Sequence, residues 1–231
     1  MKSFICFLLI IFSFSVYSKS IVSGTRLIFD GSKNEATINV SNTGNIPALI
    51  QSWIDEGDDK IEPSKINVPF IIPNAMVTLS PDESFSIRVF KKKDIDQYPK
   101  DRESLFYLNV VDIPPKPENL KDGSNALIQF VVRSRIKLIY RPSGLSGNAN
   151  LALGDLNMNF DGNYLVISNP TPFFININDI KDIETKNRVF DSIVIPPFSN
   201  KNKIKLNNKS RKISITALND LGARVEREII L

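Results

Sequence analysis

Hydrophobic and polar residues alternate in short runs along almost the whole chain. Clear examples are TRLIF at 25–29, ATINV at 36–40, SFSIRVF at 84–90 and YLVIS at 164–168. Successive side chains of a strand point to opposite faces of a sheet, so this alternation predicts strands with one buried face. Gly, Asn, Asp and Pro separate the runs, as they do in turns. The pattern predicts an all-β protein, with at most a short helical turn in the charged segment 91–104.

The strands fall into two groups along the chain. Residues 141–150, RPSGLSGNAN, lack a hydrophobic period and are rich in Gly, Ser and Asn, which is typical of a linker. Beyond them, Asp161-Gly162 stands between two alternating runs and predicts a β-hairpin. Short, evenly spaced strands favour two antiparallel sandwiches, at 19–142 and 143–231, with a single barrel as the alternative. Trp53, in ALIQSWID, is expected in the core of the first.

The first eighteen residues, MKSFICFLLIIFSFSVYS, differ from the rest. Lys2 precedes an apolar run from Phe4 to Phe14, and Val16 and Ser18 fit the −3 and −1 positions of a signal-peptidase site. The run is short for a membrane span, although a short membrane anchor is the alternative. We therefore expect a signal peptide at 1–18 and an exported mature chain.

The composition excludes several classes of chemistry. The chain has no histidine, and its one cysteine, Cys6, lies within the expected signal peptide. Ser–His–Asp triads, Cys–His pairs and zinc sites built from His or Cys are therefore excluded. The net charge of +4 is mild and does not indicate nucleic-acid binding. No glycine-rich phosphate loop is present. We expect no catalytic residue, no metal, no cofactor and no nucleotide.

The segment YPKDRESLFYLNVVDIP, residues 98–114, resembles the signature of the periplasmic pilus chaperones of the chaperone–usher pathway, the PapD-like family. GTRLIFDG, SRIKLIYRP, SNPTPFFI and LNDLGAR resemble further landmarks, so the resemblance covers nearly the whole mature chain. It implies two immunoglobulin-like β-sandwich domains set at an angle with a cleft between them. It also implies a periplasmic chaperone whose partners are pilin subunits and an outer-membrane usher.

The resemblance further implies donor-strand complementation, in which the chaperone lends a strand that fills the groove of an incomplete subunit. In ALIQFVVRS, residues 126–134, we assign Ile128, Phe130 and Val132 to the groove. The alternative is that these three residues face the chaperone's own core, as we expect for Ile136, Leu138 and Tyr140. An unpaired apolar strand is an aggregation hazard, and we expect Arg133 and Arg135 to guard against it. Whether the free form self-associates to cover this strand is left open.

Two charged groups also match the family landmarks. The resemblance implies that Arg26 and Lys137 bind the C-terminal carboxylate of the subunit, because two convergent cations suit a single terminal anion. It also implies that Glu103, Arg141 and Asp220 form an ion network between the domains and set the angle between them.

Two other functions compete with the chaperone. A structural pilus subunit or two-domain adhesin would carry its own donor strand as an N-terminal extension, whereas the alternation here begins soon after Ser18. A carboxylate-dependent hydrolase would use Glu103 and Asp220, but an arginine between them is expected to keep both ionised and leave no proton donor. The sequence therefore favours a non-enzymatic, ATP-independent chaperone.

Overall fold

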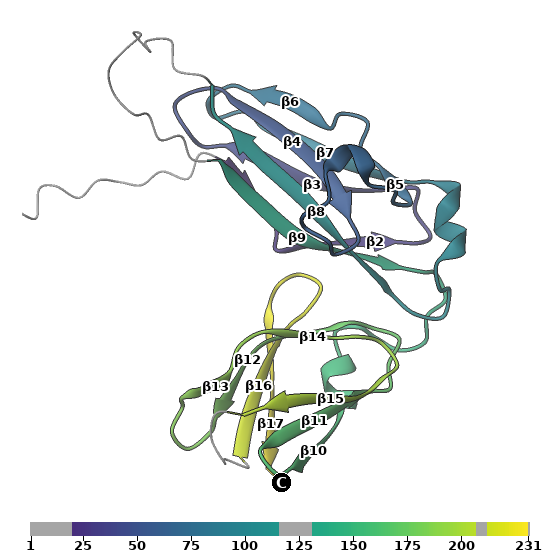
Figure 1. Ribbon diagram of the computed structural model, residues 1–231, viewed down its shortest axis with the longest axis vertical. Coiled ribbons are helices and arrows are strands. Elements are labelled where there is room, and N and C mark those ends of the chain that lie inside the picture. Colours follow the sequence, from purple (N-terminus) through teal and green to yellow (C-terminus); the bar gives the residue numbers. More distant parts are fainter. Residues whose placement is uncertain (1–19, 116–130, 207–211, 231) are drawn as a thin grey trace, which may run out of the picture.

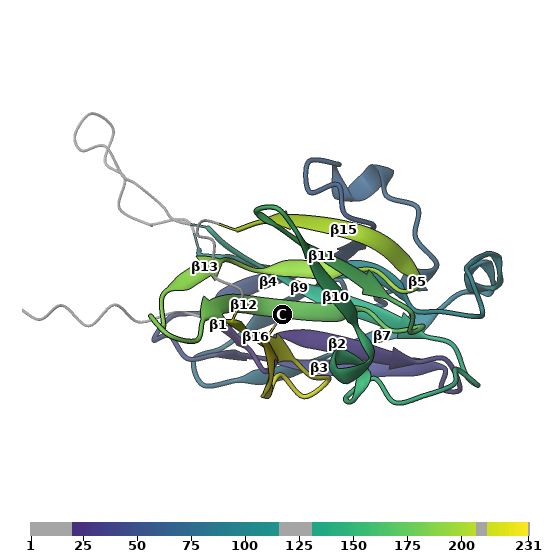
Figure 2. The same ribbon diagram turned by 90° about the horizontal axis from the view of Figure 1, so that it is seen from below.

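The computed structural model describes residues 20–115, 131–206 and 212–230. They form two β-sandwiches that follow one another along the long axis of the molecule and meet at an angle (Figure 1). In the view from below, the second sandwich is projected onto the first, as expected for stacking along that axis (Figure 2). The prediction of an all-β fold is confirmed. The domain limits at 142/143 and the cleavage after Ser18 stay predictions.

The first domain packs a four-stranded sheet against a five-stranded sheet. The first has the order β1-β3-β7-β5 and consists of β1 (Ser20–Val22), β3 (Glu35–Asn42), β7 (Ser84–Lys91) and β5 (Phe70–Ile71). The second has the order β2-β9-β8-β4-β6 and consists of β2 (Arg26–Asp30), β9 (Val132–Arg141), β8 (Ser104–Ile113), β4 (Ala48–Asp55) and β6 (Met76–Leu79). Among the strands of the described residues, only β2 and β9 pair in parallel.

The core of this domain lies between the two sheets. Phe29, Val40 and Leu108 are fully buried there, and Phe70 packs edge-on against Phe106 with ring centroids 4.9 Å apart. From β9, Leu138 and Tyr140 are buried in the same cluster, and Ile136 packs against it while partly buried. The expected assignment of these three β9 residues to the core is confirmed.

Trp53 does not lie in the core, and that expectation was wrong. In β4 the alternate residues Ala48, Ile50, Ser52 and Ile54 are buried toward the core, so alternation turns Trp53 to the outer face. The guanidinium of Arg133 lies over its ring, 5.2 Å from the centroid. Successive side chains of a strand point to opposite faces, and Ile50 and Ile54 occupy the face toward the core, so Trp53 lies on the other face.

The second domain has a three-stranded and a five-stranded sheet. The first is β10 (Asn157–Asp161), β11 (Tyr164–Asn169) and β15 (Ser199–Lys205). The second is β13 (Arg188–Phe190), β12 (Ile175–Asp182), β16 (Lys212–Leu218) and β17 (Arg224–Ile230), with β14 (Ile193–Ile195) also paired to β12. The predicted hairpin at Asp161-Gly162 is confirmed, since Asp161 pairs with Tyr164. A separate core that includes Leu165, Ile180 and Ile215 lies between these sheets.

Short 3-10 turns are the helical elements of the described residues: η1 (Pro63–Lys65), η2 (Lys93–Gln97) and η3 (Ala152–Asp155). Of these, η2 is the helical turn predicted in the charged segment. Within the described ranges, no helix has the length and apolar character needed to cross a bilayer.

Candidate functional site

Arg26 and Lys137 lie side by side at the junction between the domains. β2 begins at Arg26, which is directly opposite Lys137 in the parallel pair with β9. Nη1 of Arg26 donates a hydrogen bond of 2.9 Å to the carbonyl oxygen of Leu218, at the end of β16, so this arginine reaches into the second domain. Its buried Nε has no hydrogen-bond partner within the described part of the chain. The structure thus brings together the two cations that the sequence placed in separate landmarks.

Both cations are partly removed from water. Burial, and next the charge of Arg26, hold the pKa of Lys137 below its ordinary value. Burial also lowers the pKa of Arg26, and the charge of Asp220 offsets part of that effect. Arg26 and Lys137 repel each other, and the Nε–H of Arg26 has no acceptor among the described residues. The pair therefore has the positive charge and the hydrogen-bond donors that a single carboxylate requires.

The edge of β9 is covered by β2 over only half of its length. β2 pairs with residues 137–141, whereas β8 pairs on the other side with residues 132–140. β1, which precedes β2, pairs with β3 in the opposite sheet. In residues 20–115, 131–206 and 212–230, no strand covers the edge of Val132–Ile136 on the β2 side. Such an edge presents unpaired backbone groups and is a template for an added strand.

Of the residues predicted to fill a subunit groove, only Val132 belongs to the described ranges. Its side chain is 60% exposed, and that of its neighbour Val131 is 56% exposed. Ile128 and Phe130 lie outside the described residues. An apolar surface therefore accompanies the open edge of β9.

Glu103, Arg141 and Asp220 are in direct contact across the junction. Nε of Arg141 donates to Glu103 Oε1 at 2.6 Å, and its Nη1 and Nη2 donate to the Asp220 carboxylate at 2.7 and 2.9 Å. Glu103 is 3% exposed, and its Oε2 accepts a hydrogen bond of 2.7 Å from the N–H of Phe174 in the second domain. The N–H of Glu103 donates to the carbonyl of Pro172 at 2.9 Å. Both the side chain and the backbone of Glu103 therefore tie the domains together.

Burial is the largest influence on the pKa of Glu103. It raises this pKa above its ordinary value, while the charge of Arg141 and the hydrogen bond from the Phe174 N–H act against it. For Arg141, burial disfavours the charged form, yet the hydrogen bonds with Asp220 and the charge of Glu103 outweigh it and raise its pKa. The removal of Glu103 from water is thus the largest effect at this carboxyl group.

Two family models match the chain in sequence. The model of the pili and flagellar-assembly chaperone, PapD N-terminal domain, matches residues 20–146. The model of the pili assembly chaperone PapD, C-terminal domain, matches residues 151–229. The chain belongs to the PapD-like family of pilus assembly chaperones.

Individual relatives agree with this assignment. The probable fimbrial chaperone YadV of Escherichia coli K12 is 35% identical over 225 residues, which are 93% of this chain and 91% of YadV. The chaperone MrkB of Klebsiella pneumoniae is 35% identical over 231 residues, 97% of each chain. The crystal structure of the CupB2 chaperone of Pseudomonas aeruginosa is 30% identical, with a TM-score of 0.75 over 91% of this chain and 100% of that one. The predicted family, fold and chaperone function are confirmed, and the family implies a periplasmic location.

A polar cluster on the outer face of the chaperone's five-stranded sheet was missed by the sequence reasoning. Asp55, at the end of β4, is 2% exposed and accepts hydrogen bonds from Arg135 Nη2 at 2.5 Å, Asn109 Nδ2 at 2.7 Å and the Gly57 N–H at 2.7 Å. Burial alone would raise the pKa of Asp55, but these hydrogen bonds outweigh it and hold the pKa below its ordinary value. The carboxylate of Asp55 thereby balances the charge of Arg135, one of the cations of β9.

The two arginines of β9 that we expected to guard against aggregation are both engaged on this face. Arg133 Nε donates to Asn109 Oδ1 at 2.8 Å. The Arg135 guanidinium lies over the ring of Tyr107, 3.7 Å from its centroid. Asn109 belongs to the family signature, so its position was marked in the sequence, whereas nothing in the sequence marked Asp55. Together these contacts hold the first half of β9 in place.

Asp55→Asn is expected to lower the free energy of unfolding by about 2 kcal/mol, because a hydrogen-bonded charge is lost beside Arg135. The lowered pKa of Asp55 means that its stabilisation is present above its ordinary pKa of 3.8 and is lost as the pH falls through the lower folded value. Urea unfolding of wild type and variant between pH 6 and roughly pH 2 measures both effects. Asp191→Asn, at an exposed carboxylate 3.3 Å from Arg188, is the control and should match the wild type. Equal acid sensitivity of the wild type and Asp55→Asn would contradict the assignment.

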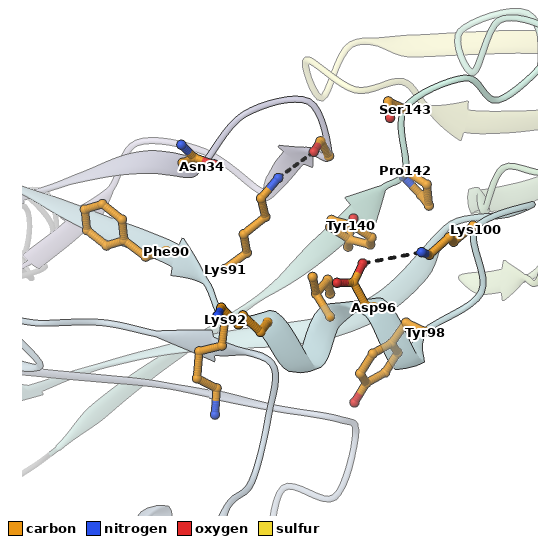
Figure 3. Close-up of a pocket in the computed structure, with 13 residues that line it drawn as sticks. Asn34, Phe90, Lys91, Lys92, Asp96, Tyr98, Lys100, Tyr140, Pro142 and Ser143 are labelled. Carbon is orange, nitrogen blue, oxygen red and sulfur yellow. Dashed lines mark hydrogen bonds and ion pairs between the residues drawn. The ribbon is translucent and has the colours of Figure 1, made fainter.

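A pocket lies elsewhere in the first domain, at the side of η2. It has a volume of about 570 Å³ and is lined by lysines and tyrosines such as Lys92, Tyr98 and Tyr140 (Figure 3). Two of its lysines are occupied, since Lys91 Nζ donates to the Gly31 carbonyl at 2.6 Å and Lys100 lies 3.4 Å from Asp96. Among the described residues, no predicted site residue lines this pocket, and no group of three or more Cys, Asp or Glu could hold a metal ion.

Proposed function

We propose that this chaperone captures pilin subunits by lending them the open edge of β9 and anchors their C-terminal carboxylate between Arg26 and Lys137. One observation carries the proposal: the edge of Val132–Ile136, which no strand of the described residues covers on the β2 side, ends where the Arg26–Lys137 pair begins. A relative at 35% identity is named a probable fimbrial chaperone, which supports fimbrial subunits as the cargo.

Strand β2 determines where an added strand stops and in which direction it runs. Because β2 occupies the edge of β9 from Lys137 onward, a strand added along Val132–Ile136 meets the N-terminal end of β2 at Arg26. A terminal carboxylate at that meeting point belongs to the C-terminal end of the added strand. The added strand then runs parallel to β9, in line with β2. The cation pair therefore selects both the end and the direction of the captured strand.

Anchoring one end also sets the register of the added strand. A slip by one residue would turn every side chain of the strand to the opposite face. With the carboxylate held, the ladder hydrogen bonds supply affinity, and the apolar side chains of Ile128, Phe130 and Val132 fill the subunit's groove. Subunits that end in the correct apolar pattern are thereby distinguished from other exported chains.

The ion network of Glu103, Arg141 and Asp220 serves to hold the two domains at the angle that keeps the carboxylate site assembled. Both oxygens of Glu103 already accept hydrogen bonds from N–H groups, which speaks against a role in hydrolysis. The chaperone acts without catalysis, nucleotide or cofactor. The subunit is released at an outer-membrane usher when the strand of the next subunit fits the groove better.

This function requires export. We assign residues 1–18 to a cleavable signal peptide, residues 19–142 to the N-terminal domain and residues 143–231 to the C-terminal domain. Cleavage after Ser18 is checked by N-terminal sequencing of the chaperone from a periplasmic extract.

Co-expression of the full chain with the pilin genes of its own cluster tests the proposed function. The expected result is a periplasmic one-to-one complex of chaperone and pilin. Incorporation of the chain into the fibre would instead indicate a pilus subunit or adhesin. Absence of any complex would contradict subunit capture.

Val132→Ser is expected to weaken the complex about tenfold, because a valine that becomes buried against the subunit contributes about 1.5 kcal/mol. The thermal melt of the free chaperone should change little, since this side chain is 60% exposed. Competition of wild type and variant for limiting pilin measures the loss. Leu138→Ser, at a fully buried position of the same strand, is the contrasting variant and should lower the melting temperature. If the melting temperature of Val132→Ser falls as far as that of Leu138→Ser, Val132 belongs to the core instead.

A further inference from the structure

The turn between β16 and β17 reaches from the second domain to both charged groups of the junction. Figure 1 shows this loop extending from the C-terminal sandwich toward the first domain. Its carbonyl at Leu218 accepts the hydrogen bond from Arg26, and its carboxylate at Asp220 accepts two hydrogen bonds from Arg141. A Cβ added to Gly222, which has a φ of +80°, would lie 3.1 Å from Thr25 Oγ1, next to Arg26. The end of β16 and this turn thus bond to the first domain at Leu218 and Asp220 and approach it closely at Gly222.

Asn219 holds this turn in shape. Its Oδ1 accepts hydrogen bonds from the N–H groups of Leu221 at 3.1 Å and Ala223 at 2.9 Å. Its backbone N–H donates to the Ala223 carbonyl, and its carbonyl accepts from the Gly222 N–H, both at 3.0 Å. An asparagine that bonds to the backbone two residues further on is a common way to fix a turn. Leu218 is held as the last paired residue of β16, and the side chain of Asn219 fixes the peptide that follows it and the turn that carries the Asp220 carboxylate.

The orientation of Arg26 depends on this turn. Among the described residues, the guanidinium of Arg26 donates one hydrogen bond, to the Leu218 carbonyl, and its buried Nε has no partner. If the end of β16 and this turn move, Nη1 loses its acceptor, and none of the described residues then fixes the guanidinium of Arg26 beside Lys137. Asp220 moves with the same turn and carries the Arg141 contacts with it.

We propose that Asn219 is a positioning residue of the carboxylate site: by fixing the β16–β17 turn, it makes the C-terminal domain hold Arg26 in the orientation that binds a subunit's terminal carboxylate. This inference rests on the proposed function. According to this inference, both domains are needed to form the carboxylate site, although both of its cations belong to the first domain. Asn219 touches neither cation, so it acts through Leu218 and Asp220.

The test compares two forms of one ligand. A short synthetic peptide of alternating valine and threonine, with a free C-terminal carboxylate or as the C-terminal amide, is titrated into the full-length chaperone by calorimetry. The wild type is expected to bind the acid about 10- to 100-fold more tightly than the amide, as charge-assisted hydrogen bonds imply. In Asn219→Ala this ratio should fall to within about threefold, while affinity for the amide stays the same. A general loss of stability would not alter the ratio.

Two variants serve as controls. Asn219→Ser retains a short acceptor for the N–H two residues further on, so its acid-to-amide ratio should lie between those of the alanine variant and the wild type. Thr185→Ala removes a side-chain acceptor, 3.4 Å from the Asn187 N–H, from another turn of the same domain and should leave the ratio unchanged. An unchanged ratio in Asn219→Ala beside a selective wild type would overturn the inference and leave the proposed function standing. A wild type that binds acid and amide equally would overturn the carboxylate anchor itself, and the inference with it.

Discussion

Lys137→Ala is expected to abolish the capture of pilin subunits while the free chaperone keeps its fold. In the proposed function Lys137 and Arg26 form one anion site, and the removal of one cation from a partly desolvated charge pair reduces binding by about 2–5 kcal/mol, or roughly 30- to 5000-fold. The free protein loses little, because the lowered pKa of Lys137 shows that its charge is unfavourable in the folded state before a carboxylate arrives.

The measurement is co-purification of pilin from a periplasmic extract, together with a thermal melt of the free variant. Arg26→Ala should give the same loss of pilin. Lys203→Ala, which removes an exposed lysine paired with Asp161 at 2.8 Å, is the matched control and should capture pilin normally. Normal recovery of pilin with Lys137→Ala would refute the carboxylate anchor. A large fall in the melting temperature of the free variant would show instead that Lys137 stabilises the fold.

Arg141→Ala is expected to lower the free energy of unfolding by about 3–5 kcal/mol, because it leaves Glu103 buried at 3% exposure without its cation. The loss should shrink at acid pH. Burial already raises the pKa of Glu103, and without Arg141 this carboxyl group takes up a proton more readily, which removes the unpaired charge. The loss of both Asp220 hydrogen bonds also frees the second domain to change its angle to the first.

Urea unfolding at neutral and acid pH measures the stability of Arg141→Ala, and small-angle scattering measures the spread of domain angles. Glu103→Gln is the informative partner variant, since it removes the buried charge while keeping an acceptor for the Phe174 N–H, and it should destabilise less. Arg88→Ala, at a surface pair with Glu35, should behave as the wild type in both measurements. An Arg141→Ala protein with wild-type stability and scattering would show that the network does not hold the domains.

The local pattern of the sequence predicted the strands and turns well. Alternation located β2, β3, β7 and β11, and Asp161-Gly162 identified the β10–β11 hairpin. The placement of Trp53 in the core was wrong because it followed from the size of the side chain and not from the alternation of buried and exposed positions along the strand. In ALIQSWID the isoleucines on either side of Ser52 determine which face is buried, and Trp53 lies on the other. The family signature supplied Arg26, Lys137, Glu103, Arg141 and Asp220 as candidates, but not the contacts that they make.

Those contacts join residues that are distant in sequence. Asp55 and Arg135 are 80 residues apart, and Arg26 and Leu218 are 192 residues apart. Propensity, alternation and turn chemistry act over a few neighbouring residues, so no local pattern could pair them. For the same reason the sequence could not show that β1 joins one sheet and β2 the other.

By itself, the sequence determined the all-β class, the phase of most strands and the family, and it supplied the charged residues of the proposed site as candidates. Only the tertiary structure decided that β2 covers β9 from Lys137 onward and does not reach Val132–Ile136, and that Leu218 of the second domain accepts a hydrogen bond from Arg26. The reason is physical: the faces of a strand follow from its own residues, whereas its free edge depends on which other strands of the folded chain pair with it.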